Sequence, residues 1–266
     1  MDRDGGNETK LVDMHGDDMY RIGFGWAPDG TRIVFSDRAD ERSTYDLSVV
    51  EVKTGEVTRL TEGGGDEEFP DWSPDGASVI YQSAGDIYEI EVEGGATTQL
   101  TDHRKSDFEP MWSPDGASIA FFSTRNDRSG SMGPYFWELY TMDADGENED
   151  RLTRHQTRKN GASWSPDGSA IAYSSRCDDD LCLDDYDDNI YVVDVSSRER
   201  RRLTSNGQRP ESNLSWSPDS RWIAFELVLR GGRTQDLGAV RVDGERTKRL
   251  TSTPDVTEVA PVWSPR

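Results

Sequence analysis

Apolar and β-branched residues along the chain fall into short runs with alternating polar positions, separated by turns rich in glycine, proline and aspartate. Runs of this kind are typical of β-strands. The most apolar of these runs each come shortly after a turn. They predict five equivalent strands: Arg32–Ser36, Ser78–Gln82, Ser118–Phe122, Ala170–Ser174 and Trp222–Glu226. The pattern therefore indicates an all-β protein.

A Trp-x-Pro pattern lies just before each of these strands and returns once more near the end of the sequence. Its tryptophans are Trp26, Trp72, Trp112, Trp164, Trp216 and Trp263. The fullest copies read Trp-Ser-Pro-Asp-Gly. Proline presets φ at the second position of a tight turn, aspartate is tolerated at the third, and glycine takes the left-handed position that follows. Each copy is predicted to be a hairpin turn after a first strand that ends at the tryptophan.

A third and a fourth strand are predicted after each hairpin. The third strands follow a variable loop and are expected at Asp46–Val52, Asp86–Val92, Trp137–Asp143, Asn189–Val195 and Gln235–Val242. The fourth strands are expected to end in a Leu-Thr pair, at Leu60-Thr61, Leu100-Thr101, Leu152-Thr153, Leu203-Thr204 and Leu250-Thr251.

The spacing of the tryptophans gives the architecture. Successive tryptophans are 46, 40, 52, 52 and 47 residues apart. A period of about 40–50 residues with four strands is that of a β-propeller blade. We therefore predict a β-propeller of four-stranded antiparallel blades. A large flat tryptophan at the end of each first strand is expected to pack between neighbouring blades.

These motifs resemble the WD40-like PD40 repeat of the TolB-like propellers. The resemblance rests on the WSPDG turns, on third strands such as Ile190–Asp194 and on the Leu-Thr pairs, and it covers nearly the whole chain. It implies a soluble, extracytoplasmic propeller that docks other proteins. The same family includes propeller domains of prolyl-oligopeptidase-type peptidases and of some polysaccharide lyases. Two departures, Ser220 in place of glycine and Gly238 in place of tyrosine, lead us to expect different packing in the fifth blade.

The two ends of the sequence match different parts of one repeat. Residues 1–11 align with residues 142–152, at the end of a third strand, and the last tryptophan ends a first strand. Residues 1–266 are therefore interpreted as a single propeller domain with five complete blades and an incomplete sixth. We expect a six-bladed arrangement in which the missing strands belong to a longer protein. A closed five-bladed ring is the alternative.

Charge narrows the range of partners. The formal net charge is −22, so phosphate backbones and anionic lipid surfaces are repelled. No run of eighteen apolar residues predicts a membrane span. A monomer that binds a protein with a basic patch is expected, through salt-sensitive association.

The first five residues lack the basic and apolar regions of a signal peptide, which favours the cytoplasm or a chain that has lost its beginning. The family resemblance and the cysteine pair instead favour a periplasmic or cell-surface location for the full-length protein, with the cytoplasm as the alternative.

A dense acidic loop is the first candidate site. Its potential oxygen ligands are Asp178, Asp180, Asp184, Asp185, Asp187 and Asp188. Hard oxygen ligands at this density suit calcium, although the spacing is not that of an EF-hand. The competing interpretation is a solvated acidic loop. The only cysteines, Cys177 and Cys182, are a candidate local disulfide in an oxidising compartment. Zinc is disfavoured because no histidine lies nearby.

Two further patterns fall in loops that are expected on the same face of the propeller as the acidic loop. His15, His103 and His155 all fall in loops between a fourth and a first strand, so a three-histidine metal site is one hypothesis and exposed loop histidines are the other. The segment Ser129–Gly133 nearly matches a nucleophile elbow, but it lacks the first glycine and lies between two predicted strands rather than before a helix. We expect no catalytic role for it.

These observations favour an interaction or scaffolding module over an enzyme. The sequence shows no plausibly placed Ser-His-Asp set, no glycine-rich phosphate loop and no strong metal-ligand spacing. No cofactor is predicted apart from calcium at the acidic loop. The alternative is that the chain is the propeller domain of a larger enzyme, a prolyl-oligopeptidase-type peptidase or, less favoured, a polysaccharide lyase.

Overall fold

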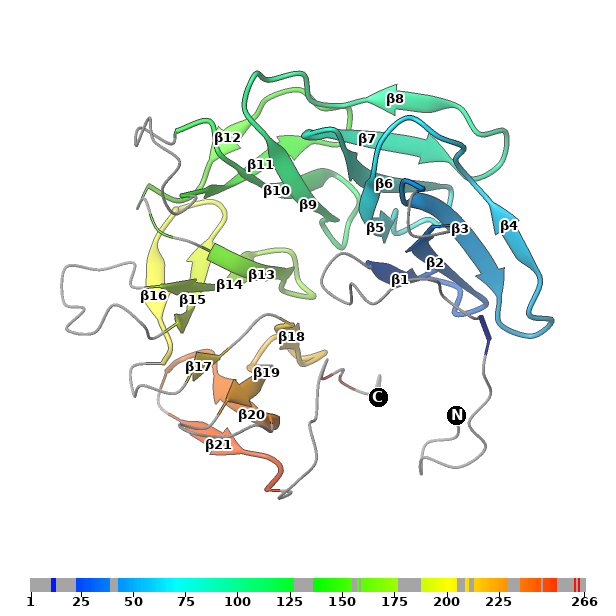
Figure 1. The fold of residues 1–266 in the computed structure, drawn as a ribbon. Helices are drawn as coiled ribbons and strands as arrows, with labels where there is room; N and C mark the ends of the chain where they lie inside the picture. The colour runs from blue at the N-terminus through cyan, green and yellow to red at the C-terminus, as the bar shows by residue number, and fades with distance from the viewer. Residues whose placement is uncertain are drawn as a thin grey trace. The chain divides into compact units, whose positions relative to one another are not determined.

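The computed structural model contains β-strands, turns and loops, and Figure 1 shows their course. It describes residues 11–12, 23–38, 43–126, 136–154, 157, 159–176, 188–204, 209–210, 213–228, 235–244, 246–252, 261 and 263. Within these ranges, 21 strands form five antiparallel sheets, which we call blades 1 to 5. Among the same residues, no helix is long and apolar enough to cross a membrane.

Each blade is an up-and-down meander in chain order. Blade 1 contains β1 (Phe24–Trp26), β2 (Arg32–Asp37), β3 (Asp46–Glu51) and β4 (Val57–Arg59). Blade 2 contains β5 (Glu67–Trp72), β6 (Ser78–Ser83), β7 (Asp86–Glu91) and β8 (Thr97–Gln99). Blade 3 contains β9 (Asp107–Trp112), β10 (Ser118–Ser123), β11 (Glu138–Asp143) and β12 (Asp150–Arg151).

Blades 4 and 5 repeat this order, with one interruption. Blade 4 contains β13 (Lys159–Trp164), β14 (Ala170–Arg176), β15 (Asp188–Asp194) and β16 (Arg200–Arg202). Blade 5 contains β17 (Arg209–Pro210), β18 (Ser215–Trp216), β19 (Trp222–Val228), β20 (Gln235–Arg241) and β21 (Thr247–Arg249). Both β17 and β18 pair with β19, so together they take the place of a single first strand.

The predicted fold class is confirmed: the described chain is all-β and is built from propeller blades. The predicted second and third strands lie where the sequence placed them, to within one or two residues at their ends. The fourth strands end before the Leu-Thr pairs rather than at them. In blade 1, Leu60 and Thr61 both donate their N–H groups to the carbonyl of Leu47, so the regular pairing stops at Arg59. The residues predicted to start and end a sixth blade lie largely outside the described residues.

The blades belong to two compact units. The first comprises residues 1–112, 118–121 and 143–147, and the second comprises residues 113–117, 122–142 and 148–266. Blades 1 and 2 with strand β9 lie in the first unit. Blades 4 and 5 lie in the second.

The Ser-Pro-Asp-Gly turns have the same geometry in four blades. The serine hydroxyl donates to the aspartate two residues later at 2.6–2.7 Å, in the pairs Ser73–Asp75, Ser113–Asp115, Ser165–Asp167 and Ser217–Asp219. The position after the aspartate is left-handed. In blade 5 this position is Ser220, with φ 54°, and its N–H still donates to the carbonyl of Ser217 at 2.9 Å. The departure from glycine therefore leaves the turn intact.

The threonine of each Leu-Thr pair fastens the fourth strand to the third. In every blade its hydroxyl accepts the N–H of the second residue of the third strand, or of the residue equivalent to it, at 2.8–2.9 Å. The threonines are Thr61, Thr101, Thr153, Thr204 and Thr251. This buried hydrogen bond explains why the pair recurs in the sequence.

The tryptophans join neighbouring blades within each unit. In the first unit, Trp72 Nε1 donates to the carbonyl of Gly25 at 3.1 Å. In the second, Trp216 Nε1 donates to the carbonyl of Ser163 at 3.0 Å. Both acceptors precede the tryptophan of the previous blade, so the indole bridges two first strands while its ring lies in an apolar cluster.

The fifth blade differs at the position that is tyrosine in blades 2 and 4. There, Tyr88 and Tyr191 stack on the tyrosine of the adjacent strand, with ring centroids 5.7 and 5.6 Å apart. In blade 5, Phe225 lies opposite Gly238 and fills the space itself. A Cβ at Gly238 would lie 2.6 Å from Phe225 Cζ. Blade 5 therefore packs differently at this position: Phe225 and a glycine replace the two stacked tyrosines of blades 2 and 4.

Replacing Gly238 with alanine is therefore expected to destabilise the protein. Phe225 is 1% exposed, so its ring has no free space into which to move. Overpacking of this kind costs roughly 1–3 kcal/mol. Urea unfolding would measure the loss, and Gly244→Ala is a useful comparison because a Cβ there meets no atom within 4 Å and any cost comes from its positive φ alone. Equal losses in the two variants would contradict the packing argument.

Candidate functional site

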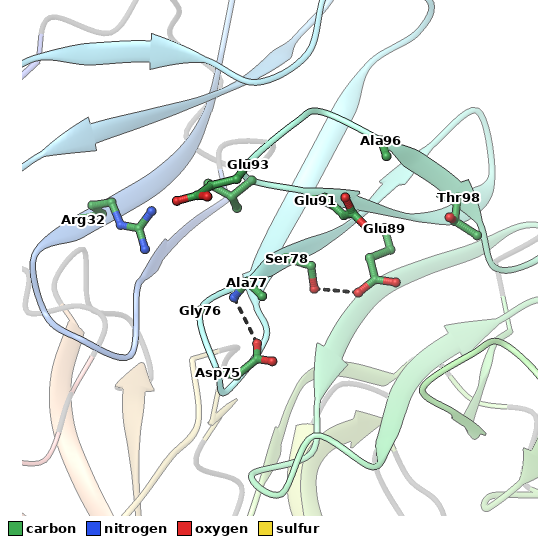
Figure 2. A pocket seen from close by; sticks show the side chains of 11 residues that line it. Arg32, Asp75, Gly76, Ala77, Ser78, Glu89, Glu91, Glu93, Ala96 and Thr98 are labelled. Atoms are coloured by element: carbon green, nitrogen blue, oxygen red, sulfur yellow. Dashed lines mark hydrogen bonds between the residues drawn. The ribbon is translucent and has the colours of Figure 1, made fainter.

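An acidic cleft on blade 2 is the site that the described residues define best. Its volume is about 520 Å³. Three glutamates on and just after β7, together with the turn aspartate between β5 and β6, give it its charge: Glu89, Glu91, Glu93 and Asp75. Arg32 of blade 1 is its only cationic lining residue among the described ones. In Figure 2, Arg32 and Glu93 lie toward one end and Glu89 and Thr98 toward the other.

The pleat of β7 produces this arrangement. Side chains two residues apart on a strand point to the same face, so Glu89 and Glu91 of β7 direct their carboxylates to one side, and Glu93 follows them in the turn after the strand. The alternating Ile90 is buried in the apolar cluster of the opposite face. The same alternation of Glu89, Ile90 and Glu91 is visible in the sequence and signals the acidic stripe.

Hydrogen bonds hold two of the carboxylates in place. The Ser78 hydroxyl donates to Glu89 Oε1 at 2.6 Å, and Asp75 Oδ1 accepts the N–H of Ala77 at 3.0 Å (Figure 2). The hydrogen bond from the Ser73 hydroxyl, followed by that from Ala77, lowers the pKa of Asp75 below its usual 3.8. Asp75 is therefore ionised at neutral pH and adds a negative charge to the lining of the cleft.

The arginine that lines the cleft already contacts two other side chains. The Arg32 guanidinium lies 4.8 Å from the centre of the Trp72 ring and 3.6 Å from Asp29. Glu91 and Glu93 are exposed. The cleft therefore presents net negative charge to solvent, which suits lysine or arginine side chains of another molecule.

The described residues do not form a metal centre. No group of three or more His, Cys, Asp or Glu side chains within the described ranges is arranged to hold an ion. The carboxylates of the cleft are therefore interpreted as a charged surface rather than as a ligand set.

A second cluster of charges is buried in the second unit. Lys159 Nζ lies 3.0 Å from Glu138 Oε2, and Arg151 Nη2 lies 2.9 Å from Glu138 Oε1. The Thr153 hydroxyl donates to Glu138 Oε2 at 2.5 Å. Lys159 also donates to the carbonyl of Trp137 at 3.2 Å, and the Trp137 indole donates to the carbonyl of Lys159. This network joins blade 3 to blade 4 and is buried, so its role is structural.

Asp71 on β5 forms a comparable link in the first unit. Its Oδ2 accepts the N–H of Trp112, the last residue of β9, at 2.8 Å. Burial raises the pKa of this carboxyl to about 6, against the smaller opposing effect of hydrogen bonds from the N–H groups of Trp112 and Trp72. Asp71 is therefore a group that titrates just below neutral pH.

Most of the site residues predicted from the sequence lie outside the described residues. This applies to Cys177, Cys182, Asp178, Asp180, Asp184, Asp185, Asp187, His15 and His155, and to Ser129–Gly133. Asp188 is described by its backbone, as the first residue of β15. His103 is exposed in the loop between β8 and β9, where its Nδ1 accepts the N–H of Lys105 at 3.1 Å. The calcium, disulfide and three-histidine hypotheses remain predictions.

The fold and its blade architecture define a β-propeller. The model of the TolB β-propeller domain, the PD40 repeat, matches residues 1–181. The chain therefore belongs to this family, and the recognition made from its turns and Leu-Thr pairs is confirmed.

Relatives of similar sequence are longer proteins. An uncharacterized protein of Agrobacterium fabrum is 31% identical over 184 residues, which are 69% of this chain and 58% of that protein. The Tol-Pal system protein TolB of Anaeromyxobacter dehalogenans is 31% identical over 127 residues, covering 48% of this chain and 26% of that protein. In these alignments the chain matches less than two thirds of the length of each relative.

Solved structures share the fold. TolB from Acinetobacter baumannii superposes with a TM-score of 0.67 at 22% identity, covering 92% of this chain and 57% of that one. An oligogalacturonate lyase from Vibrio parahaemolyticus gives the same TM-score at 12% identity, covering 86% and 64%. At these identities the likeness is one of fold alone.

Proposed function

We propose that this TolB-like propeller is a non-catalytic docking module that binds a basic segment of a partner protein at the acidic cleft of blade 2. The observation that carries the proposal is that Glu89, Glu91 and Glu93 line one cleft, where the single described arginine, Arg32, is already paired. The wider charge of the protein supports it, since a net charge of −22 attracts a cationic partner from a distance.

The glutamates are expected to contribute through charge rather than shape. A lysine-rich peptide such as decalysine should bind the protein with an affinity that falls steeply between 50 and 300 mM salt, because screening shortens the reach of exposed charges. Changing the three glutamates to glutamine should weaken binding at low salt by roughly tenfold, about 1.4 kcal/mol. Glutamine keeps the size of each side chain and can still accept the hydrogen bond from Ser78.

A matched control separates the cleft from the general charge of the protein. The variant Glu51→Gln/Glu56→Gln/Glu62→Gln removes the same charge from blade 1, at glutamates that do not line the cleft. It should weaken peptide binding less than threefold, as measured by fluorescence anisotropy. If both triple variants weaken binding equally, the peptide responds to net charge and the cleft has no special role.

We also propose an extracytoplasmic location for the full-length protein. The support is membership of the TolB β-propeller family together with the two cysteines in one loop, which suit an oxidising compartment. Cell fractionation with an antibody to this chain would test it, and a purely cytoplasmic signal would contradict it.

The alternative function is that of a propeller domain within a larger enzyme. The likeness to an oligogalacturonate lyase favours it, and so does the greater length of the relatives. The full-length protein would then cleave an acidic polysaccharide in a reaction abolished by a chelator. Such cleavage would displace the docking proposal, since a substrate of that charge is repelled by the acidic cleft.

A further inference from the structure

The junction between blades 1 and 2 contains an arginine stacked on the tryptophan that joins the two blades. The guanidinium of Arg32, the first residue of β2, lies 4.8 Å from the centre of the Trp72 ring. Its Nη2 atom lies 3.6 Å from Asp29 Oδ2, in the turn that precedes β2. A guanidinium is attracted both to the face of an indole and to a carboxylate. At this junction the protein therefore fills the space beside the tryptophan with its own cation.

The junction between blades 4 and 5 has the same framework. Trp216 repeats the hydrogen bond of Trp72, because its Nε1 donates to the carbonyl of Ser163 in the previous blade at 3.0 Å. Asp167 holds the turn position of Asp29, and in each aspartate Oδ1 accepts the N–H two residues later, at 3.0 and 2.8 Å. The indole and the carboxylate that hold Arg32 at the first junction therefore have counterparts at the second.

The arginine has no counterpart there. β14 begins with Ala170, whereas β2 begins with Arg32. The registers confirm that the two positions are equivalent, since Ala170 lies opposite Asp194 and Arg32 lies opposite Glu51. Beside Ala170 is a cleft of about 500 Å³, lined by residues of both blades, among them Trp216, which is 7% exposed. In the part of the chain that the structure describes, no cation stacks on this tryptophan.

Three carboxylates line this cleft: those of Asp167, Asp194 and Glu199. The hydrogen bond from the Ser165 hydroxyl is the main reason that the pKa of Asp167 lies below its usual 3.8. The N–H of Ser197 has the same effect on the pKa of Asp194. Both aspartates are therefore ionised at neutral pH and favour a cationic group in the cleft.

Two arginines of β16 also line the cleft and limit which ligand suits it. The Arg200 guanidinium lies 5.6 Å from the centre of the Tyr191 ring, and Arg201 is exposed. Positive charge on this side opposes a polycation. The mixed charge instead favours a single cationic side chain within a peptide segment whose neighbouring residues are neutral or acidic.

We propose that the cleft between blades 4 and 5 binds the guanidinium of an arginine side chain from a peptide or protein partner, stacked on Trp216 and beside Asp167. The arginine of the ligand takes the place that Arg32 fills at the junction of blades 1 and 2. A guanidinium suits this framework better than an ammonium, because its planar and weakly hydrated group stacks on an aromatic ring while its N–H groups bind a carboxylate. This site shares no residue with the acidic cleft of blade 2, so each stands or falls independently.

Titration with a blocked arginine tests the site. N-acetyl-arginine amide would be added to the isotopically labelled 266-residue protein while NMR follows the indole N–H signals. The Trp216 signal should shift saturably, whereas the Trp72 signal should not, because Arg32 already covers that ring. N-acetyl-citrulline amide has nearly the same shape without the charge and should bind about tenfold more weakly. An unshifted Trp216 signal, or equal binding of the two probes, would overturn the proposal.

Two substitutions exchange the features of the two junctions. Ala170→Arg should fill the cleft with the protein's own cation and weaken binding of the probe at Trp216 about tenfold. Arg32→Ala should open the equivalent cleft, so that the Trp72 signal also shifts with the probe. Thr58→Arg adds the same charge at an exposed position of β4 and should leave the Trp216 titration unchanged. Unaltered binding to Ala170→Arg, or an unshifted Trp72 signal in Arg32→Ala, would contradict the equivalence on which the proposal rests.

Discussion

Replacing Lys159 with methionine is expected to destabilise the protein by about 3–5 kcal/mol, because the change leaves the buried carboxylate of Glu138 without one of its two cations. The lysine is fully buried, and Glu138 is 2% exposed. Arg151 still contacts the other carboxylate oxygen, so the loss should fall toward the lower end of this range. Urea unfolding followed by tryptophan fluorescence would measure it.

A second variant distinguishes the cost of an unpaired charge from the value of the ion pair. The double substitution Lys159→Met/Glu138→Leu removes both charges and should be less destabilising than the single change, since buried pairs add little over apolar residues of similar volume. Lys53→Met, at an exposed lysine, should change stability by less than about 0.5 kcal/mol. A single variant as stable as Lys53→Met would show that the buried pair is unimportant.

Replacing Asp71 with asparagine is expected to stabilise the protein at pH 7.5. The pKa of Asp71 in the folded protein, about 6, lies above the usual 3.8 of an aspartate, so folding favours the protonated form. The contribution of Asp71 to stability is therefore fully present below pH 3.8 and is lost as the pH rises through 6. Asparagine stays neutral and can still accept the N–H of Trp112, so it should recover roughly 1–3 kcal/mol.

The pH profile gives the sharper test of this effect. Between pH 7.5 and pH 5 the parent protein should gain stability relative to Asp71→Asn, and the two curves should converge toward acid. Asp75→Asn is the control, because its carboxyl has a lowered pKa and titrates below this window. A constant difference between parent and Asp71→Asn from pH 5 to 7.5 would show that Asp71 does not titrate there.

The blades could be predicted from the sequence because their signals are local. A Ser-Pro-Asp-Gly turn contains its own hydrogen bonds, such as that between Ser73 and Asp75, so its four residues favour the turn without help from distant parts of the chain. The alternation of apolar residues then sets the second and third strands. Even the altered turn with Ser220 could be placed, since its neighbours Ser217 and Asp219 retain the pattern.

Features that join distant residues could not be predicted. The pairing of Lys159 with Glu138 depends on the contact between two blades, and nothing near either residue signals it. The first strands are also bulged in an unexpected way. Phe69 and Glu109 have φ of 54° and 49°, where the equivalent position of blade 4 has a glycine, Gly161. Local preference argues against bulky residues in this conformation, so tertiary contacts must impose it.

The candidate site falls between these cases. The stripe of Glu89, Glu91 and Glu93 is visible in the sequence as a period of two, whereas its cleft depends on the turn at Asp75 and on Arg32 from the previous blade. The density of aspartates points instead to residues 178–188, most of which lie outside the described residues, so that prediction stays open.

The threonine hydrogen bond between the third and fourth strands has a consequence for how the chain folds. In all five blades it joins residues 14 positions apart, although the loops between the second and third strands vary widely in length. Closing so short a segment costs little chain entropy, and contacts of low sequence separation form quickly. Each outer hairpin is therefore expected to form early, and insertions in the loop before it should slow folding very little.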